Sequence, residues 1–415
     1  MKYFPSFRFF PVAAGAAMFS ASVFAQSTPA PAAKAAAPAD KPYKILATTK
    51  IPAAGGIDYV NADSAARRVY VACGNTVSVF DLDTYKLVGS LPNASGHGVA
   101  LDPENHTGLV SGNPAVFFNT QTLQPIKTIP TPRADGYIFD PLTHHFFILT
   151  HGDPNLYVID SKDGSLVTTI PHLGKDDTAG AIEQGATDGQ GHLYFDVENQ
   201  GCIAVVDAKT LQVTGHYDLG EKGGGNAGLA IDPKNHILFA MCRGGNGNGP
   251  TCVILSATDG KIITTLPLAG GSDGGGFNPA TMEAFSSTGN DGKGSGALSI
   301  IKENSPTDFV LEDTVVTKPG AKTCTLDAKT GNIITITEEA LPTPAPAAGS
   351  ATAASTSAPA ASAASATPAA SAAASGQVAA ATPPADSAGG RGGRGGRGGR
   401  GPRGPQQLDV IFVGR

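Results

Sequence analysis

The sequence predicts an all-β fold, a β-propeller of seven four-stranded blades. One unit recurs seven times, and each copy is marked by an Asp or Asn in the turn after its first expected strand, at positions 63, 102, 140, 188, 232, 278 and 327. Each copy holds short Val-, Ile-, Phe- and Tyr-rich segments separated by Gly, Asn and Asp, and none has the length of a helix. Spacings of 38 to 49 residues with four short strands per copy are typical of propeller blades.

Residues 63–92 show the unit most clearly. RVYVAC and TVSVF are two apolar segments separated by Gly74-Asn75, a pair that tolerates positive φ and suits a hairpin. An Asp-rich turn at 81–84 then leads into a third segment, YKLVGSLP. The alternating apolar positions predict a small antiparallel sheet.

The two ends of the chain complement each other. Residues 43–52 form an outer strand with no blade of its own, whereas the seventh copy, TCTLDAKTGNIITIT, lacks an outer strand. We therefore expect the N-terminal outer strand to join the C-terminal blade and close the ring, which removes a free sheet edge. The terminal QLDVIFVGR supplies the third strand of that blade. The propeller then takes 43–340 plus 408–415, with 341–407 as an insert in the last blade.

The N-terminus has the features of a secretory signal peptide. Lys2 and Arg8 precede an apolar stretch at 9–24, and Val23-Phe24-Ala25 offers a cleavage site after Ala25. Residues 26–42 form an Ala/Pro linker. No other apolar run is long enough to span a membrane. We expect a periplasmic or secreted protein without a membrane span, and a monomer.

The insert at 341–407 is rich in Ala, Pro and Ser and then reads RGGRGGRGGRGPRG, so it cannot bury a core. Its arginines, spaced by glycines, could hold phosphates of a nucleic acid or another anionic polymer: Arg391, Arg394, Arg397, Arg400 and Arg403. The alternative is a solvated loop. These five residues carry +5 of a net charge of −6, so the rest of the chain is acidic. Propeller topology places this loop over the face described below, where we expect it to shield an acidic site.

The chain contains five cysteines. Cys242 and Cys252 flank the loop RGGNGNGPT between two expected strands, and in an oxidising compartment this favours a cross-strand disulfide. The alternative is two buried free thiols. No partner can be assigned to Cys73, Cys202 or Cys324.

The unit VYVACGNTVSVFDLDTYKLVGSLP resembles the YVTN repeat of the exported YncE-like β-propellers. HGVALDPENH, AGLAIDPKNHILFAMC and the terminal VIFVGR resemble it too, and the similarity covers nearly all of the foldable chain. It implies the propeller fold and export, and no particular reaction. The sequence departs from the repeat at Cys73, where Asn is expected. Related quinoprotein and haem-enzyme propellers share the blade pattern, but their cofactor-ligand motifs are not found here.

First strands of propeller blades line a central channel, so equivalent positions in them form a ring. The position five residues before each marker is occupied by Asp58, His97, Asp135, Glu183, Ala227, Asp273 and Lys322, and Asn226 stands beside the small member. Asp58, His97, Asp135, Glu183 and Asp273 predict a site for a divalent metal, and with Asn226 and Lys322 they predict a binding funnel for a cationic small molecule. The alternative is a water-filled mouth whose residues need only be polar.

Two other patterns are attributed to structure. His106, His144, His192 and His236 each lie four residues after a marker, which indicates repeated turn chemistry in separate blades. The Gly-rich runs at 244–249 and 289–296 are expected to be hairpin loops, because a phosphate loop needs a strand before it and a helix after it.

These observations predict an exported propeller that acts as a binding or scaffold protein for an unidentified small molecule or protein, with its ligand in the funnel. No nucleophile or redox motif is found, which favours binding over catalysis. The open alternatives are a propeller enzyme, either a metal-dependent lactonase-type hydrolase or an oxidoreductase, and nucleic-acid or surface-polymer binding through the arginine-rich insert. The cofactor stays unknown, with a divalent metal as the candidate.

Overall fold

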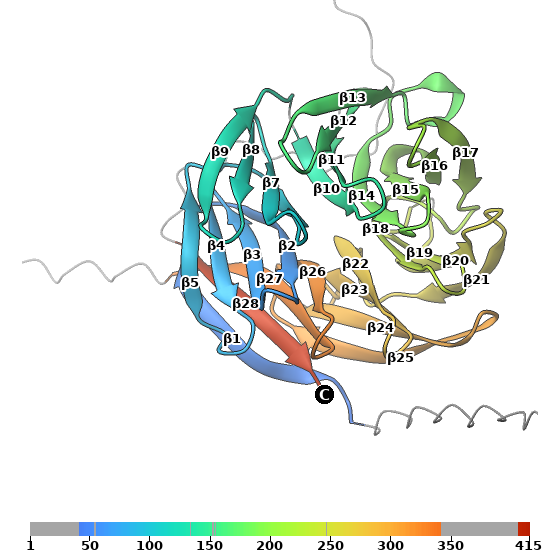
Figure 1. Ribbon diagram of the computed structural model, residues 1–415. Helices are drawn as coiled ribbons and strands as arrows, with labels where there is room; N and C mark the ends of the chain where they lie inside the picture. The colour runs from blue at the N-terminus through green and yellow to red at the C-terminus, as the bar shows by residue number, and fades with distance from the viewer. Residues whose placement is uncertain are drawn as a thin grey trace, which may run out of the picture. The chain divides into compact units, whose positions relative to one another are not determined.

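The computed structural model describes residues 41–341, apart from positions 54, 133, 152, 154 and 246, together with residues 406–415. The described chain belongs to one compact unit, Lys41–Arg415, and it forms seven four-stranded antiparallel sheets arranged as a β-propeller (Figure 1). The predicted fold class is confirmed. No helix in this part of the chain has the length and hydropathy needed to cross a membrane.

The strands of each blade are named outward from the channel. Blade 1 has β2 (Ile57–Asp63), β3 (Arg68–Cys73), β4 (Thr76–Asp81) and β5 (Leu87–Pro92), and blade 2 has β6 (Gly98–Asp102), β7 (Thr107–Ser111), β8 (Ala115–Asn119) and β9 (Gln124–Ile129). Blade 3 has β10 (Ala134–Asp140), β11 (His145–Thr150), β12 (Asn155–Asp160) and β13 (Leu166–Pro171). Blade 4 has β14 (Ile182–Thr187), β15 (His192–Val197), β16 (Cys202–Asp207) and β17 (Val213–Asp218), with the short 3-10 helices η1 (Lys175–Asp177) and η2 (Glu198–Gln200) beside it.

Blade 5 has β18 (Asn226–Asp232), β19 (Ile237–Cys242), β20 (Thr251–Ser256) and β21 (Ile262–Pro267). Blade 6 has β22 (Gly274–Asn278), β23 (Glu283–Thr288), β24 (Gly296–Ser305) and β25 (Asp308–Thr317). Blade 7 has β26 (Lys322–Asp327), β27 (Asn332–Ala340), β28 (Gln406–Gly414) and β1 (Lys44–Pro52).

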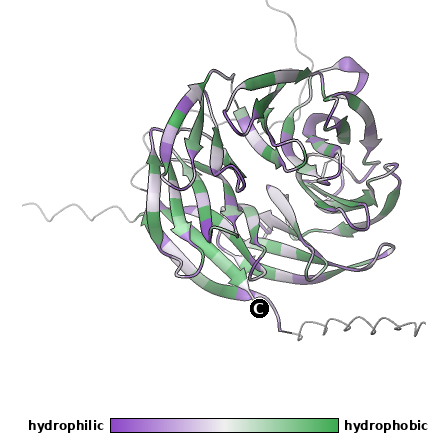
Figure 2. Cartoon of the chain, viewed as in Figure 1, coloured by the Kyte–Doolittle hydropathy of each residue, from purple (hydrophilic) through white to green (hydrophobic). Residues whose placement is uncertain are grey.

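Apolar side chains fill the spaces between neighbouring blades. Seven hydrophobic clusters occur in the described chain, and each one joins two adjacent sheets. The second and third strands are buried on both faces, whereas the fourth strands expose side chains such as Val88 and Ile126. Figure 2 shows hydrophobic colour along many of the strands and polar colour in the turns. Face-to-face packing explains why RVYVAC and similar segments are apolar at successive positions.

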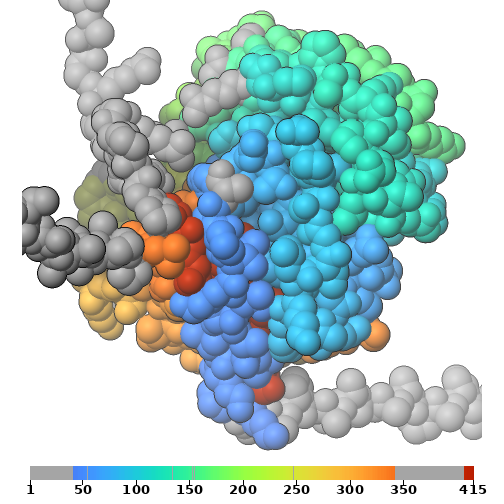
Figure 3. Space-filling view, turned by 90° about the vertical axis from the view of Figure 1, so that its left-hand side faces the viewer, coloured from blue at the N-terminus to red at the C-terminus, as the bar shows by residue number. Residues whose placement is uncertain are grey.

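Blade 7 is assembled from both ends of the described chain, which confirms the predicted closure. β1 pairs with β28 along its whole length, Lys44 to Pro52. The other edge of β28 pairs with β27, where Gln406 lies opposite Ala340. In Figure 3 the red β28 lies beside the blue β1. Lys318, which lies just before β26, contacts Glu339 of β27 and the fully buried Asp409 of β28. Closure leaves no sheet of the ring without a partner on either side.

The marker residues form turns, as predicted. Asp63, Asp102, Asp140, Asp232, Asn278 and Asp327 each end a first strand, and Asp188 follows one directly. Four residues later Arg67, His106, His144, His236 and Met282 all adopt a positive φ near 55°. Three of the four predicted turn histidines therefore owe their recurrence to this turn, and the fourth, His192, contacts Asp188. The Gly-rich runs at 244–249 and 289–296 lie between second and third strands, which confirms that they are hairpin loops.

The predicted disulfide is wrong. Cys242 and Cys252 are both free and buried. Cys252 pairs with Met241, one residue out of register with Cys242, so the two side chains point to opposite faces of the sheet. Cys242 packs between blades 4 and 5, and Cys252 between blades 5 and 6. The spacing across the hairpin gave the correct pairing of strands but could not give the register.

Candidate functional site

Bulges in the first strands aim polar side chains at one mouth of the channel. Ile57 pairs with Cys73 and Val60 with Val71, so β2 holds one more residue than the segment of β3 that it faces. The same irregularity occurs at the start of β10 and β14. An extra residue interrupts the strict alternation of a strand, which allows two successive side chains, Asp58 and Tyr59, to face the channel.

Asp58 lies between neighbours from blades 2 and 7. His97 Nδ1 lies 2.7 Å from Asp58 Oδ2, and Lys322 Nζ lies 2.6 Å from Asp58 Oδ1. Thr323 donates to the backbone carbonyl of Asp58 at 2.6 Å. Three predicted residues from three blades therefore meet at this point. A cavity of about 300 Å³ adjoins Asp58 and His97.

Asp135 lies between two histidines. Its Oδ1 is 3.5 Å from His97 Nδ1, and its Oδ2 is 3.2 Å from His151 Nδ1. His151 Nδ1 is also 3.7 Å from Glu183 Oε1. The ligand atoms of Asp58, His97 and Asp135 all lie within 4.8 Å of one another, and so do those of Asp135, His151 and Glu183. Each set offers one imidazole nitrogen and two carboxylates, and Asp135 belongs to both.

Arg243 occupies the next part of the mouth. Its guanidinium lies 3.4 Å from Glu183 Oε1 and 2.6 Å from Asp273 Oδ1, and it also contacts Glu198. We use the name channel ring for the series of nine residues that these contacts join, Lys322, Asp58, His97, Asp135, His151, Glu183, Glu198, Arg243 and Asp273. The ring places histidines, a lysine and an arginine between its five carboxylates, so each carboxylate of the ring contacts a basic side chain.

Six of the seven predicted funnel residues belong to the channel ring. The exception is Asn226, which is fully buried and donates to the carbonyl of Cys202 at 3.1 Å. Its place in the ring was predicted wrongly, because it pairs with Cys242 at the start of β18, and burial keeps its side chain from a ligand. The predicted polyanion site, arginines 391–403, lies outside the described residues, as does the signal peptide.

Three ring residues at the ends of second strands were missed, because the prediction from the sequence considered only the first strands: His151, Glu198 and Arg243. Each directly follows such a strand, and in an antiparallel hairpin the end of the second strand lies beside the start of the first. A signal was available, because His151 and Arg243 both lie 11 residues after their markers, and Glu198 lies 10 residues after its marker. Counting forward from each marker, as well as backward, would have found them.

The charges of the ring stabilise one another. Burial alone would raise the pKa of Asp58, but the hydrogen bond from His97 and the ammonium of Lys322 outweigh it and hold this pKa below its ordinary value. Burial would likewise lower the pKa of Lys322, and the carboxylates of Asp58 and Asp273 raise it instead. Both groups therefore stay charged at neutral pH.

Behind Glu183 lies a buried carboxyl group that holds the bulge. Asp196 is fully buried, and its Oδ1 accepts from the backbone N–H groups of Glu183 at 3.1 Å and Gln184 at 2.8 Å. Burial raises the pKa of Asp196 well above its ordinary value, and the nearby Glu183 adds to this effect. The two hydrogen bonds fix the backbone that presents Glu183 to the ring.

Side chains cross the channel directly beneath the ring. The Tyr59 hydroxyl, from blade 1, donates to the carbonyl of Glu183 in blade 4 at 2.8 Å. Gln184 donates to the carbonyl of Gly275 at 2.9 Å and accepts from the N–H of Gly275 at 3.0 Å, so it joins blade 4 to blade 6. The Tyr137 ring lies edge-on to Tyr59 with centroids 5.8 Å apart. We call Tyr59, Tyr137 and Gln184 the crossing layer.

The chain is similar to known proteins in its structure and not in its sequence. No family model matches the chain, and no curated protein sequence matches it. Among solved structures, U3-55K superimposes with a TM-score of 0.57 at 11% identity, covering 69% of this chain and 90% of that one. The WD40 repeats of RRP9 give a TM-score of 0.57 at 11% identity, with 69% and 89% covered. A chain of the mitotic checkpoint complex gives 0.58 at 15% identity, with 76% and 96% covered.

These similarities show the fold alone. The chain is a seven-bladed β-propeller like the WD40 propellers. Membership of the YncE-like family stays a prediction.

Proposed function

We propose that this protein is an exported binding protein whose channel ring holds a divalent metal ion. The observation that carries the proposal is the pair of ligand sets that share Asp135. Each set combines one histidine nitrogen with two carboxylates within 4.8 Å. Imidazole and carboxylate together are ligands for divalent first-row transition metals, and pure oxygen sets suit Mg²⁺ and Ca²⁺ better.

The surroundings of the sets support this assignment. Their members come from four blades, so the closed ring of sheets fixes their positions. Glu183 is held from behind by Asp196, and the Ser111 hydroxyl donates to the carbonyl of Asp135 at 3.0 Å. Metal ligands need such outer hydrogen bonds to hold their orientation. In this proposal Lys322 and Arg243 limit the negative charge beside the metal.

Export rests on the signal-like N-terminus, and the scaffold role rests on the fold. A β-propeller is a fold of binding and scaffold proteins, and one structural neighbour is a chain of the mitotic checkpoint complex. We propose that a metal-loaded channel mouth is the face that this protein offers to a partner.

Metal titration of the purified protein tests the proposal. Isothermal titration with Zn²⁺ and with Mn²⁺ should show saturable binding, and Asp135→Asn should weaken it at least about 100-fold because both sets lose a charged ligand. Asp163→Asn is the matched control, since Asp163 lies on an exposed turn of the same blade. Equal binding by wild type and Asp135→Asn would overturn the proposal, and so would no binding of either metal.

A further inference from the structure

A second cavity lies at the other end of the channel. Its volume is about 700 Å³, which is within the range of small-molecule sites. It is lined by first-strand residues that follow the channel ring in sequence, and by turn residues that follow the markers, such as Pro103, Glu104 and Pro141. Since first strands run from the ring to the markers, this cavity opens on the face opposite the ring.

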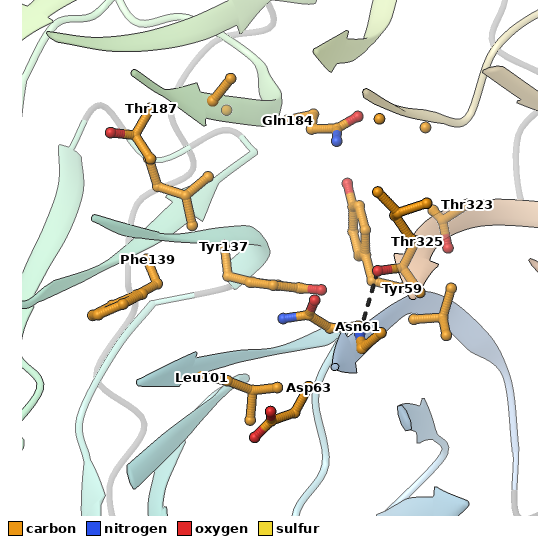
Figure 4. Close-up of a pocket in the computed structure, with 18 of the residues that line it drawn as sticks. Tyr59, Asn61, Asp63, Leu101, Tyr137, Phe139, Gln184, Thr187, Thr323 and Thr325 are labelled. Atoms are coloured by element: carbon orange, nitrogen blue, oxygen red, sulfur yellow. Dashed lines mark hydrogen bonds between the residues drawn. The ribbon is translucent and has the colours of Figure 1, made fainter. Parts of the chain in front are cut away.

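The crossing layer separates the two sites. Tyr59, Tyr137 and Gln184 all line the cavity, and their hydrogen bonds and ring contacts span the channel between it and the ring. Figure 4 shows these three side chains around the cavity together with Phe139, Leu101 and Asn61. A molecule in the cavity would therefore touch different residues from those that hold a metal.

The inner wall of the cavity is aromatic and apolar. Tyr59, Tyr137, Phe139 and Phe277 contribute rings, and Leu101 and Leu326 contribute aliphatic surface. The Tyr137 ring is packed so closely that a Cβ on Gly98 would lie 2.1 Å from it, which fixes its position. Among the described residues its hydroxyl has no hydrogen-bond partner. Rigid ring faces with one unused hydrogen-bonding group suit a flat aromatic molecule.

The mouth of the cavity carries negative charge. Asp63, Asp102 and Glu104 line it, and the described lining contains no Lys or Arg. His144 also lines it, with Nδ1 3.1 Å from Asp102 and Nε2 3.6 Å from Glu104. Burial would raise the pKa of Asp102, but hydrogen bonds from Ser161 and Asn105 hold it below its ordinary value, so the group stays ionised. Glu104 is the most exposed of the three, with 81% of its side chain accessible. An anion would meet repulsion here, and a cation would be attracted.

From these features we propose that the cavity binds an aromatic amine, with its ring against Tyr59, Tyr137 and Phe139 and its ammonium group at the acidic mouth. Aromatic faces also attract the cationic group as it passes the wall. This site is independent of the metal site proposed above, because it shares none of the residues that would bind the metal.

Indole probes test the proposal without interference from the protein, which contains no Trp. Tryptamine, neutral indole and indole-3-acetate carry the same ring with charges of about +1, 0 and −1 at neutral pH. The indole fluorescence and anisotropy should show binding of tryptamine, binding of indole at least about fivefold weaker, and no binding of the acetate at the same concentrations. Equal binding of all three, or no binding of tryptamine, would overturn the proposal.

Two variants locate the site. Ala186→Phe places a ring in the cavity and should weaken tryptamine binding at least about tenfold. Glu104→Gln changes an exposed side chain. It should reduce the affinity for tryptamine and leave the affinity for indole unchanged. Circular dichroism and thermal denaturation midpoints equal to those of wild type show that both variants fold. Tryptamine binding that neither variant alters would place the amine elsewhere and overturn the assignment.

Discussion

The two ends of the channel use the same residue type for different purposes. At the ring end, Asp58 contacts His97 and Lys322 and Asp135 contacts His97, all across blades, and 13 to 18% of each aspartate side chain stays exposed. At the marker end, Asp102 is fully buried and accepts hydrogen bonds from the side chains of Asn105 at 2.7 Å and Ser161 at 2.5 Å. The ring carboxylates share their partners and stay partly accessible, whereas both oxygens of Asp102 already accept hydrogen bonds. A repeated Asp therefore indicates a direct ligand only where its partners leave an oxygen free, and Asp102 can act on the amine proposed above only through its charge.

We expect the largest loss of stability from a substitution at the marker end of the channel. Asp102→Ala should lower the free energy of unfolding by about 2–4 kcal/mol, because it leaves the donors of Ser161 and Asn105 unpaired at a blade interface. Chemical denaturation measures this loss. Asp135→Asn should cost less than about 1 kcal/mol in the same experiment, since the amide oxygen can still accept from His151. A larger loss for Asp135→Asn than for Asp102→Ala would break the distinction between the two ends.

A second prediction concerns pH and Glu303, whose side chain lies beside the marker-end turn of blade 5. Burial, and the carboxylate of Asp232 beside it, raise the pKa of Glu303 from 4.5 to about 7. The folded protein keeps this proton up to about pH 7, whereas the unfolded chain releases it near pH 4.5, so stability should fall as pH rises between these values.

Glu303→Gln removes this dependence and should stabilise the protein by about 1–2 kcal/mol at pH 8. The amide oxygen can still accept from Asn235, which is 2.7 Å from Glu303 Oε1. Denaturation midpoints at pH 5 and pH 8 measure the effect, with the exposed Glu221→Gln as the control. A variant whose midpoint changes with pH as steeply as that of wild type would contradict the assignment.

Arg243 provides a prediction for the ring end. Arg243→Gln leaves Glu183, Glu198 and Asp273 without their guanidinium, so the affinity for Mn²⁺ should rise by about tenfold through stronger attraction. Lys175→Gln is the matched control, because its partner Asp218 lies on an outer strand, 2.8 Å from Lys175 Nζ. Weaker Mn²⁺ binding in Arg243→Gln than in wild type would show that the guanidinium helps to build the site.

The smallest effect is expected in the crossing layer. Tyr59→Phe removes the hydrogen bond to the carbonyl of Glu183 and should weaken metal binding by a factor of about two to ten, the value of one hydrogen bond. Tyr217→Phe is the control, since its hydroxyl donates to the carbonyl of Ala257 at 3.0 Å on an outer strand. Equal losses in the two variants would assign the effect to general stability.

The fold could be predicted from the sequence because each blade repeats its local signals. The marker turns, the Gly74-Asn75 hairpin and the unmatched strand at 43–52 gave the blade count and the closure. Six residues of the channel ring could then be predicted, because equivalent positions in repeated strands must face one axis. These signals depend only on spacing along the chain.

The other features of the site depend on the pairing register of the strands and on how deeply each side chain is buried. Spacing along the sequence gives neither. Cys252 pairs with Met241 and not with Cys242, and this one-residue offset separates the two thiols that the sequence suggested as a pair. Asn226 stays out of the ring because its side chain is buried between strands. His151 and Arg243 enter the ring from second strands. The crossing layer also could not be predicted, because its contacts join blades that lie far apart in sequence.

Anomalous diffraction from crystals grown with Mn²⁺ tests the central claim most directly, namely that the ring end of the channel is the metal-binding end. We predict an anomalous peak within coordination distance of Asp135 and of either His97 or His151. A peak at the marker-end carboxylates, or no peak at the ring in crystals saturated with Mn²⁺, would contradict the account.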